Sequence, residues 1–259
     1  GHQSRGDSRK EPVGPGSSVR KARVAGGATG VASRVPEYKF TLSVAKRLQK
    51  ELKKRGYEVY MVRTKNNVNI SNKKRAMLAN KSGADIYIRI HGDSSGSRGV
   101  KGASIFYPSA RNPYVSRLSR SSKRLSKKLL NAYCKKTGIK KRGCSGRDDL
   151  TGTNWSKIPV TLIECGFLSN PSEDRKLQNK SFQKKMAVGM EDTVLEKIDS
   201  LWPQTNYCMC DRCRLDIACY SLNHLPTRYV TTNAGAVLHK FDSLTTQSDA
   251  EITACVYRA

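Results

Sequence analysis

The sequence predicts an α/β fold in which an open mixed or parallel sheet is flanked by helices, followed by a second, small α/β module. Helix-patterned segments alternate with short apolar runs of strand length. Charged side chains stand at the ends of those runs, at the sheet edge where open α/β folds place their chemistry. The charge also changes abruptly near residue 200, and four cysteines cluster beyond that point.

The net charge is large and unevenly distributed. The 259 residues carry a formal charge of +27, and residues 1–200 hold 43 Lys and Arg against 16 Asp and Glu. Residues 201–259 hold five of each class, so we expect one domain at 1–199 and another at 200–259. A domain this basic attracts polyanions such as nucleic acid, anionic lipid or anionic wall polymers, although a solubilising surface without a partner explains the charge equally well.

Several classes of protein are disfavoured. No aromatic-rich basic motif of an RNA-binding sheet is present. No apolar stretch approaches the length that spans a membrane, so we expect no membrane span. No signal peptide is visible in the chain.

The first half of the basic domain is expected to begin with a long loop over residues 3–35, which are rich in Gly, Ser, Pro and Arg. A helix should follow from Glu37 to about Arg55, because apolar side chains recur at helical spacing and Gly56 can end it. The remaining expected elements are a strand at 57–64, a helix from its cap Ser71 to Ala79, and a strand at 85–90 that ends on His91.

The second half predicts a strand at 103–107, a long basic helix at 114–136, a strand at 160–163 and a last helix at 181–202. Beyond Pro203 the pattern changes. The expected elements there are a helix at 211–222, a hairpin of 228–232 and 236–241 turned at Asn233-Ala234-Gly235, and a strand or helix at 251–257.

The most informative residue is Glu164, a carboxylate that directly follows the apolar run Val160–Ile163. His2 precedes a Gly-rich segment, Glu37 begins a helix and His91 ends a strand. Two His and one Glu are a common ligand set for a catalytic zinc, and a separate Glu is the general base that such a site needs. A lone His is more often structural, but these four residues are expected to meet at one edge of the sheet.

Five segments in a fixed order strengthen this hypothesis: Gly1-His2-Gln3, Pro36-Glu37-Tyr38, Arg75–Asn80, Ala84–His91 and Ile163–Asn170. Together they resemble the zinc-dependent N-acetylmuramoyl-L-alanine amidases of bacterial cell walls, over residues 1–199. The resemblance implies that His2, Glu37 and His91 bind zinc and that Glu164 is the catalytic Glu. It implies cleavage of the amide between N-acetylmuramic acid and L-alanine in peptidoglycan, at the cell wall or outside the cell.

The chain departs from that family in two places. The strand that usually leads into the Gly-His is missing, so His2 is expected to lack an anchor. Gly92-Asp93-Ser94 replaces the usual small Ala-Asn after the second His.

Other residues near these motifs can be explained without a role in catalysis or metal binding. Arg75 and Asn80 are expected to stabilise a helix end, and Cys165 to be a small buried residue. Arg147 and Asn154, which precede the catalytic strand, could contact substrate carboxylates or serve the surface alone.

The cysteine cluster predicts a second, structural zinc site. Cys208, Cys210 and Cys213 have spacings at which thiolates share a zinc, and Cys219 or Cys255 would be the fourth ligand. Cys219 equally fits a buried apolar role. Residues 190–259 resemble the late-competence ComFB family, which implies a small zinc-binding α/β module and, for some members, cyclic-dinucleotide sensing.

Two functional hypotheses follow. The first is a zinc amidase that carries a regulatory or structural module. The second is a non-catalytic cationic protein that binds cell wall or another polyanion and is joined to a cyclic-dinucleotide sensor or a structural zinc module.

Overall fold

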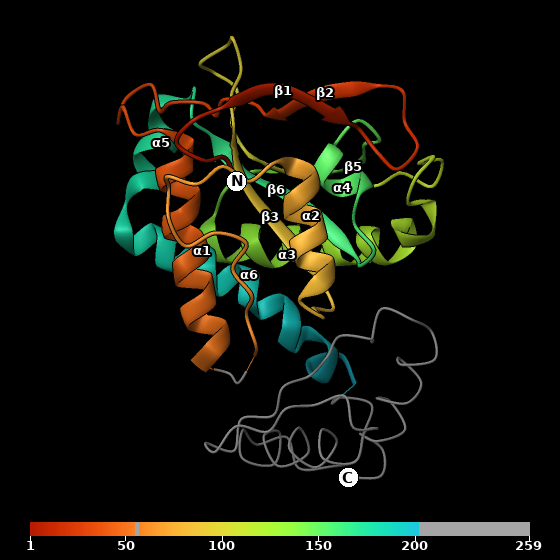
Figure 1. Cartoon of the computed structure of the whole chain (residues 1–259). Helices are drawn as coiled ribbons and strands as arrows, with labels where there is room; N and C mark the ends of the chain where they lie inside the picture. Colours follow the sequence, from red (N-terminus) through yellow and green to blue (C-terminus); the bar gives the residue numbers. More distant parts are fainter. Residues whose placement is uncertain (55–56, 202–259) are drawn as a thin grey trace.

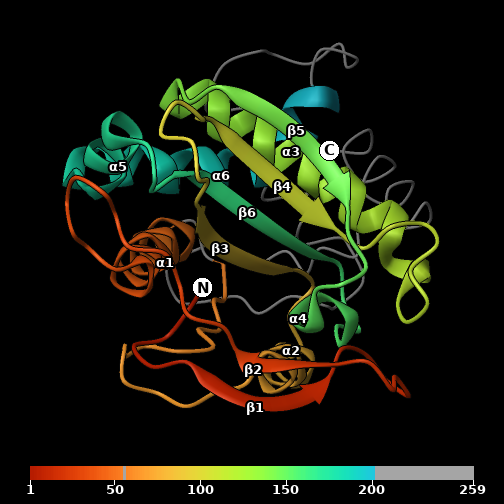
Figure 2. The same ribbon diagram turned by 90° about the horizontal axis from the view of Figure 1, so that it is seen from above.

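The computed structural model describes residues 1–54 and 57–201 (Figure 1). Its centre is a four-stranded mixed sheet in the order β3-β6-β4-β5, formed by β3 (Tyr87–Asp93), β6 (Val160–Phe167), β4 (Ala103–Tyr107) and β5 (Lys141–Gly146). β3 is parallel to β6 and β4 is parallel to β5, whereas β4 and β6 are antiparallel. The sheet is therefore mixed and flanked by helices, as the sequence predicts. Figure 2 shows this order, with β3 and β5 at its two edges.

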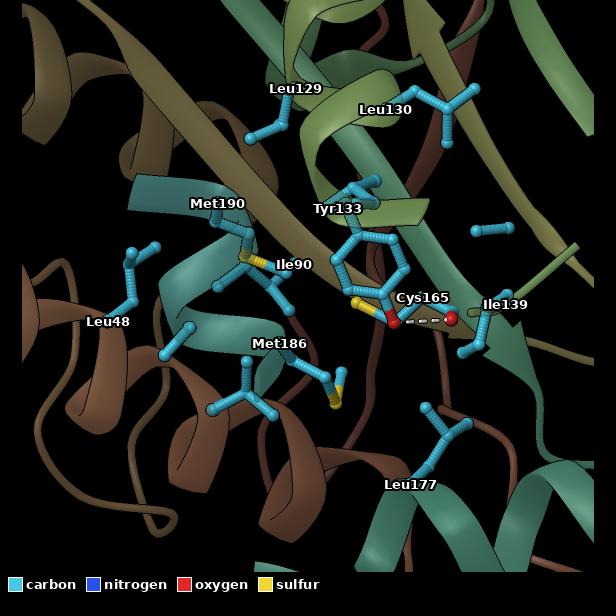
Figure 3. Close-up of a cluster of buried hydrophobic side chains, with 14 of the residues drawn as sticks. Leu48, Ile90, Leu129, Leu130, Tyr133, Ile139, Cys165, Leu177, Met186 and Met190 are labelled. Atoms are coloured by element: carbon cyan, nitrogen blue, oxygen red, sulfur yellow. Dashed lines mark hydrogen bonds between the residues drawn. The ribbon is translucent and has the colours of Figure 1, made fainter. Parts of the chain in front are cut away.

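One face of the sheet carries the main hydrophobic core, which three long helices cover. These helices are α1 (Glu37–Lys54), α3 (Ser119–Thr137) and α6 (Lys180–Leu201). Their apolar side chains meet Ile90, Ile105 and Ile163 of the sheet. Figure 3 shows part of this cluster around Tyr133. The Tyr133 hydroxyl donates a hydrogen bond to the Cys165 carbonyl at 2.7 Å, which satisfies a polar atom that is fully buried.

The other face is covered by shorter elements. α2 (Asn72–Lys81) packs through Ala76 and Ala79 on Tyr87 and Val160. α4 (Thr151–Asn154) packs beside α2. Because side chains alternate along a strand, His91 and Glu164 point to this same face as Tyr87 and Val160. The candidate site is thus on the face opposite the main core.

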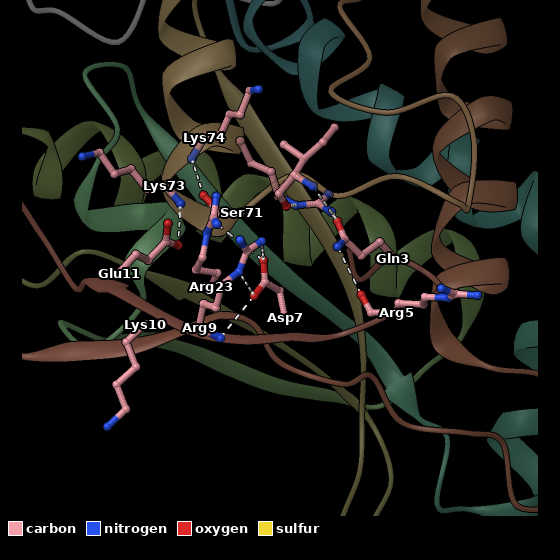
Figure 4. A network of polar contacts seen from close by, with 12 residues as sticks. Gln3, Arg5, Asp7, Arg9, Lys10, Glu11, Arg23, Ser71, Lys73 and Lys74 are labelled. Carbon is pink, nitrogen blue, oxygen red and sulfur yellow. Dashed lines mark hydrogen bonds and ion pairs between the residues drawn. The ribbon is translucent and has the colours of Figure 1, made fainter.

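Residues 3–35 are not one long loop, as the sequence analysis expected. They contain an antiparallel hairpin of β1 (Asp7–Pro12) and β2 (Arg20–Val24). Long-range polar bonds attach this region to the start of α2 (Figure 4). Gln3 Oε1 accepts hydrogen bonds from the Ile70 amide at 3.0 Å and the Arg75 guanidinium at 2.7 Å, and Glu11 accepts one from the Lys73 amide at 2.9 Å.

The expected strand at residues 57–64 is also wrong, because this segment forms no strand. A strand needs a neighbour for its backbone groups. Among the described residues β3 pairs only with β6, so the sheet does not extend past β3. The helix predicted at 114–136 begins later, at Ser119, after a 3₁₀ turn at Ser116–Leu118.

Three further elements were not expected. β5 is polar and glycine-containing, so its sequence lacks strand alternation. α4 is a single turn. α5 (Pro171–Gln178) had visible signals, because Asn170 caps it through the Ser172 and Glu173 amides and Pro171 stands at its first position. No helix in residues 1–54 and 57–201 combines the length and apolar character that crossing a bilayer requires.

Candidate metal centre

The carboxylate of Glu37 lies at the centre of the site. Glu37 is buried and is the first residue of α1. Its Oε2 accepts a hydrogen bond from the Ala28 amide at 3.1 Å, and its Oε1 accepts one from the Gly92 amide at 3.2 Å. Two backbone donors from different segments therefore fix the orientation of this carboxylate.

His91 contributes the second group. It follows the buried part of β3, and its Nδ1 lies 3.0 Å from Glu37 Oε1, while its Nε2 is buried without a hydrogen-bond partner. Burial is the main cause that lowers the pKa of His91 well below its usual range. The ring is therefore neutral at pH 7 and keeps a nitrogen lone pair.

His2 contributes the third group and, contrary to expectation, is anchored. Its Nδ1 lies 2.8 Å from the Ala25 carbonyl oxygen, which assigns the proton to this nitrogen. Its Nε2 faces Glu37 Oε2 at 3.5 Å, and its ring meets that of His91 edge to face with centroids 4.9 Å apart. Burial is the main cause that lowers the pKa of His2, so this imidazole also presents a lone pair.

The three side chains form a compact donor set. One ligand atom from each of His2, Glu37 and His91 lies within 4.8 Å of the others. Two neutral imidazoles and one carboxylate match the donor types that zinc prefers, and the buried His91 Nε2 lacks a partner among the described residues. The residues present therefore fit a divalent metal ion.

Gly27 leaves the space that this arrangement needs. A Cβ atom at this position would lie 2.9 Å from Glu37 Oε2 and 3.0 Å from Cγ and Cδ2 of His2. Any side chain at residue 27 would push against two of the three donors. The Gly-rich segment after β2 thus has a specific reason for its composition.

Glu164 lies beside this donor set and is separate from it. It pairs with His91 across β3 and β6, and its buried Oε2 has no hydrogen-bond partner in the described part of the chain. Burial raises the pKa of Glu164 to about 8, with further contributions from the negative charges of Glu37 and Asp93. A strongly perturbed carboxyl group beside a candidate metal site is typical of an acid–base catalyst.

Asp93 is a charged neighbour that the sequence analysis did not assign to the site. It ends β3, and burial raises its pKa, while the positive charges of Arg142 and Arg147 act in the opposite direction. Its position two residues after His91 was the available signal. Asp93 acts on the same group as Glu37, because the negative charges of both raise the pKa of Glu164.

Of the two residues suggested as substrate contacts, one lies near the site and the other is buried away from solvent. Arg147 lies near the site, since the charges of Glu164 and Asp93 contribute to its raised pKa, but its guanidinium already binds Asp149 at 2.7 and 2.9 Å. Asn154 cannot contact substrate as it stands. It is fully buried and donates hydrogen bonds to the carbonyls of Val13 and Asp148.

Arg75, Asn80 and Cys165, which the sequence analysis expected to have structural roles, are held by contacts within the fold. Arg75 is buried and donates to Gln3 and to the Ile70 carbonyl. Asn80 bonds the Trp155 carbonyl and the Lys157 amide. Cys165 is fully buried and its thiol pKa is raised by burial, which makes it a poor nucleophile. The cysteine site proposed for Cys208, Cys210, Cys213 and Cys219 lies outside the described residues.

Comparison with known families fits this geometry. The family model described as N-acetylmuramoyl-L-alanine amidase, Amidase_3, matches residues 1–196. The chain belongs to this amidase family. A second model, described as late competence development protein ComFB, matches residues 189–259. The two matches overlap within the sequence of α6.

Similar proteins are amidases by name. A putative N-acetylmuramoyl-L-alanine amidase of Buchnera aphidicola is 28% identical over 197 residues, which cover 64% of this chain and 89% of that protein. The probable cell wall amidase LytH of Staphylococcus aureus is 26% identical over 160 residues, covering 60% of this chain and 49% of LytH.

Solved structures support the fold. The N-acetylmuramoyl-L-alanine amidase of Clostridium difficile 630 superposes with a TM-score of 0.60 at 31% identity, covering 67% of this chain and 90% of that one. An N-acetylmuramyl-L-alanine amidase of Mycobacterium smegmatis reaches a TM-score of 0.68 at 24% identity, with 76% and 92% coverage, and supports the fold alone.

Proposed function

We propose that this chain hydrolyses peptidoglycan at the amide bond between N-acetylmuramic acid and the L-alanine of the stem peptide. In this proposal His2, Glu37 and His91 hold a zinc ion and Glu164 is the catalytic residue. The observation that carries the proposal is the position of Glu164, whose buried Oε2 has no partner among the described residues and which lies across from His91, beside a His-Glu-His donor set. The family membership of residues 1–196 supports it independently.

The metal would supply one part of the chemistry. When bound, zinc acts as a Lewis acid on the scissile carbonyl and makes water acidic near neutral pH. The protein contributes the rigidity of the donor set, because Ala25 orients His2 while the Ala28 and Gly92 amides orient Glu37.

Glu164 moves the proton. Its unpartnered Oε2 accepts a proton from the attacking water as the water oxygen bonds to the lactyl carbonyl carbon. The same carboxyl group then donates this proton to the alanine nitrogen as the C–N bond breaks. The products are a lactyl carboxylate and a free α-amino group on L-alanine.

The test uses a soluble substrate, N-acetylmuramoyl-L-alanyl-D-isoglutamine, and follows the appearance of new α-amino groups. We expect release by the full chain, loss of release with a chelator and recovery when zinc is added back. Release that is indifferent to chelation would contradict the metal role. Binding to purified wall without any new amino groups would favour the non-catalytic alternative instead.

For residues 200–259 we propose a separate module with a structural zinc bound by Cys208, Cys210, Cys213 and Cys219. The spacing of the thiolates and the ComFB match support it. A cyclic dinucleotide is its proposed ligand. Equilibrium dialysis of the full chain against a labelled cyclic dinucleotide tests this, and absence of saturable binding would refute it.

A further inference from the structure

A long acid-free segment forms one side of the molecule. Residues 94–147 contain 15 Lys and Arg and no Asp or Glu, so this segment accounts for +15 of the total +27. It includes β4, α3 and the edge strand β5, which pack together. Figure 2 shows α3 running beside β4 and β5, at the sheet edge opposite β3. More than half of the net charge therefore comes from elements that pack together.

Part of this segment lines an open cleft of about 1280 Å³. Four cationic side chains line it: Arg117, Arg120 and Lys123 at the start of α3, and Lys157 before β6. All four are exposed, and none forms an ion pair within the described part of the chain. Asp85 is the carboxylate among the lining residues. We call this feature the basic cleft.

The basic cleft is separate from the candidate metal centre. It borders the residues that precede β3 and β6, whereas His91 and Glu164 lie toward the other ends of these strands. Val160 and Glu164 are four residues apart on β6, roughly 13 Å at the usual strand rise. A ligand in the basic cleft would leave the metal centre open.

We propose that the basic cleft binds a phosphodiester polymer of the cell wall, of the polyol-phosphate type. Unpaired Arg and Lys side chains supply the charge-assisted hydrogen bonds that phosphate oxygens accept. The cleft is larger than typical small-molecule pockets of about 300–1,000 Å³, and it is open, which suits a chain that passes through. Lys127, one turn beyond Lys123, continues the cationic path along α3.

Two competing polyanions fit less well. Interfacial membrane helices insert an apolar face, but the apolar side chains of α3 are buried in the core. Single-stranded nucleic acid is held by stacking on aromatic side chains. The exposed large apolar residues among those described are Val19, Tyr60 and Met77, and none lies in this segment. The choice of a wall polymer rests on the proposed peptidoglycan substrate.

Protection of the edge strand β5 explains only some of the cationic side chains in this segment. Cationic side chains on an edge strand prevent strands of other molecules from pairing with it. This accounts for Lys141 and Arg142 on β5. It does not account for cations that line the basic cleft away from that edge.

The test measures binding of poly(glycerol phosphate) to the full chain at several salt concentrations. The cleft variant replaces Arg120, Lys123 and Lys157 by Gln. The control variant removes the same charge from exposed positions of α1, with Lys46, Lys50 and Lys53 replaced by Gln. The cleft variant should lose at least about ten-fold in affinity and reduce the slope of log K against log salt by about 2, at about 0.7 for each lost phosphate contact.

The control variant should stay within about two-fold, since it keeps the local field of the cleft. Equal losses in the two variants would show that net charge alone attracts the polymer and would overturn the proposal. So would tighter binding of duplex DNA or of phosphatidylglycerol vesicles at equal charge concentration. Cleavage of soluble N-acetylmuramoyl-L-alanyl-D-isoglutamine should be unchanged in the cleft variant, so failure of the amidase and failure of the binding surface are distinguishable.

Discussion

Replacing Gly27 by Ala is expected to weaken metal binding without unfolding the protein. The new Cβ atom would lie 2.9 Å from Glu37 Oε2 and 3.0 Å from two ring carbons of His2, where ordinary contacts are at least 3.4 Å. One or both donors must therefore move. Overpacking of this kind costs about 1–3 kcal/mol, and disturbing the residues that orient metal ligands typically lowers affinity about 10–100-fold.

The adjacent glycine provides a matched control. A Cβ atom at Gly26 would meet nothing within 4 Å, so Gly26→Ala adds the same methyl group to the same segment without touching a donor. Zinc affinity is measured by competition with a chromophoric chelator, and thermal unfolding is measured on the metal-free forms. We expect a loss of about 10–100-fold for Gly27→Ala and almost none for Gly26→Ala. Equal affinities for the two variants would refute the role assigned to the donor set.

Two further predictions concern the rest of the chain. Replacing Cys208, Cys210 and Cys213 together by Ser should reduce bound zinc from two ions per chain to one, and an unchanged metal content would remove the cysteine site. Tyr133→Phe should lower the free energy of unfolding by about 1–3 kcal/mol, because the Cys165 carbonyl loses its buried donor; a denaturant midpoint equal to that of the unchanged protein would contradict this.

Much of the fold could be predicted because its signals are local. The apolar stripe of α1 and the Ser71 cap of α2 lie within single elements, and the structure confirms both. The hairpin β1–β2 could not be found this way. Its strands are polar, and bonds from Gln3 and Glu11 to the start of α2 attach it to the domain. The segment 57–64 has the strand pattern but no neighbouring strand, and pairing is a property of two segments.

The site was predictable for a different reason. Its residues stand at element ends, and the register of β3 and β6 brings His91 beside Glu164. The sequence did not reveal the space at Gly27, because this space depends on which segment folds back against Glu37. Asp93 stands two residues after His91, and this spacing was a local signal that the sequence analysis did not use.

The central claim is that Glu164 moves a proton and does not bind the metal. Its most direct test compares Glu164→Gln with Glu58→Gln, an exposed control, for release of new L-alanine amino groups from purified peptidoglycan and for zinc content. We expect Glu164→Gln to lose on the order of 10²–10⁴ in rate while its zinc content stays equal to that of the control. Turnover near that of the control, or loss of zinc together with activity, would contradict the assignment.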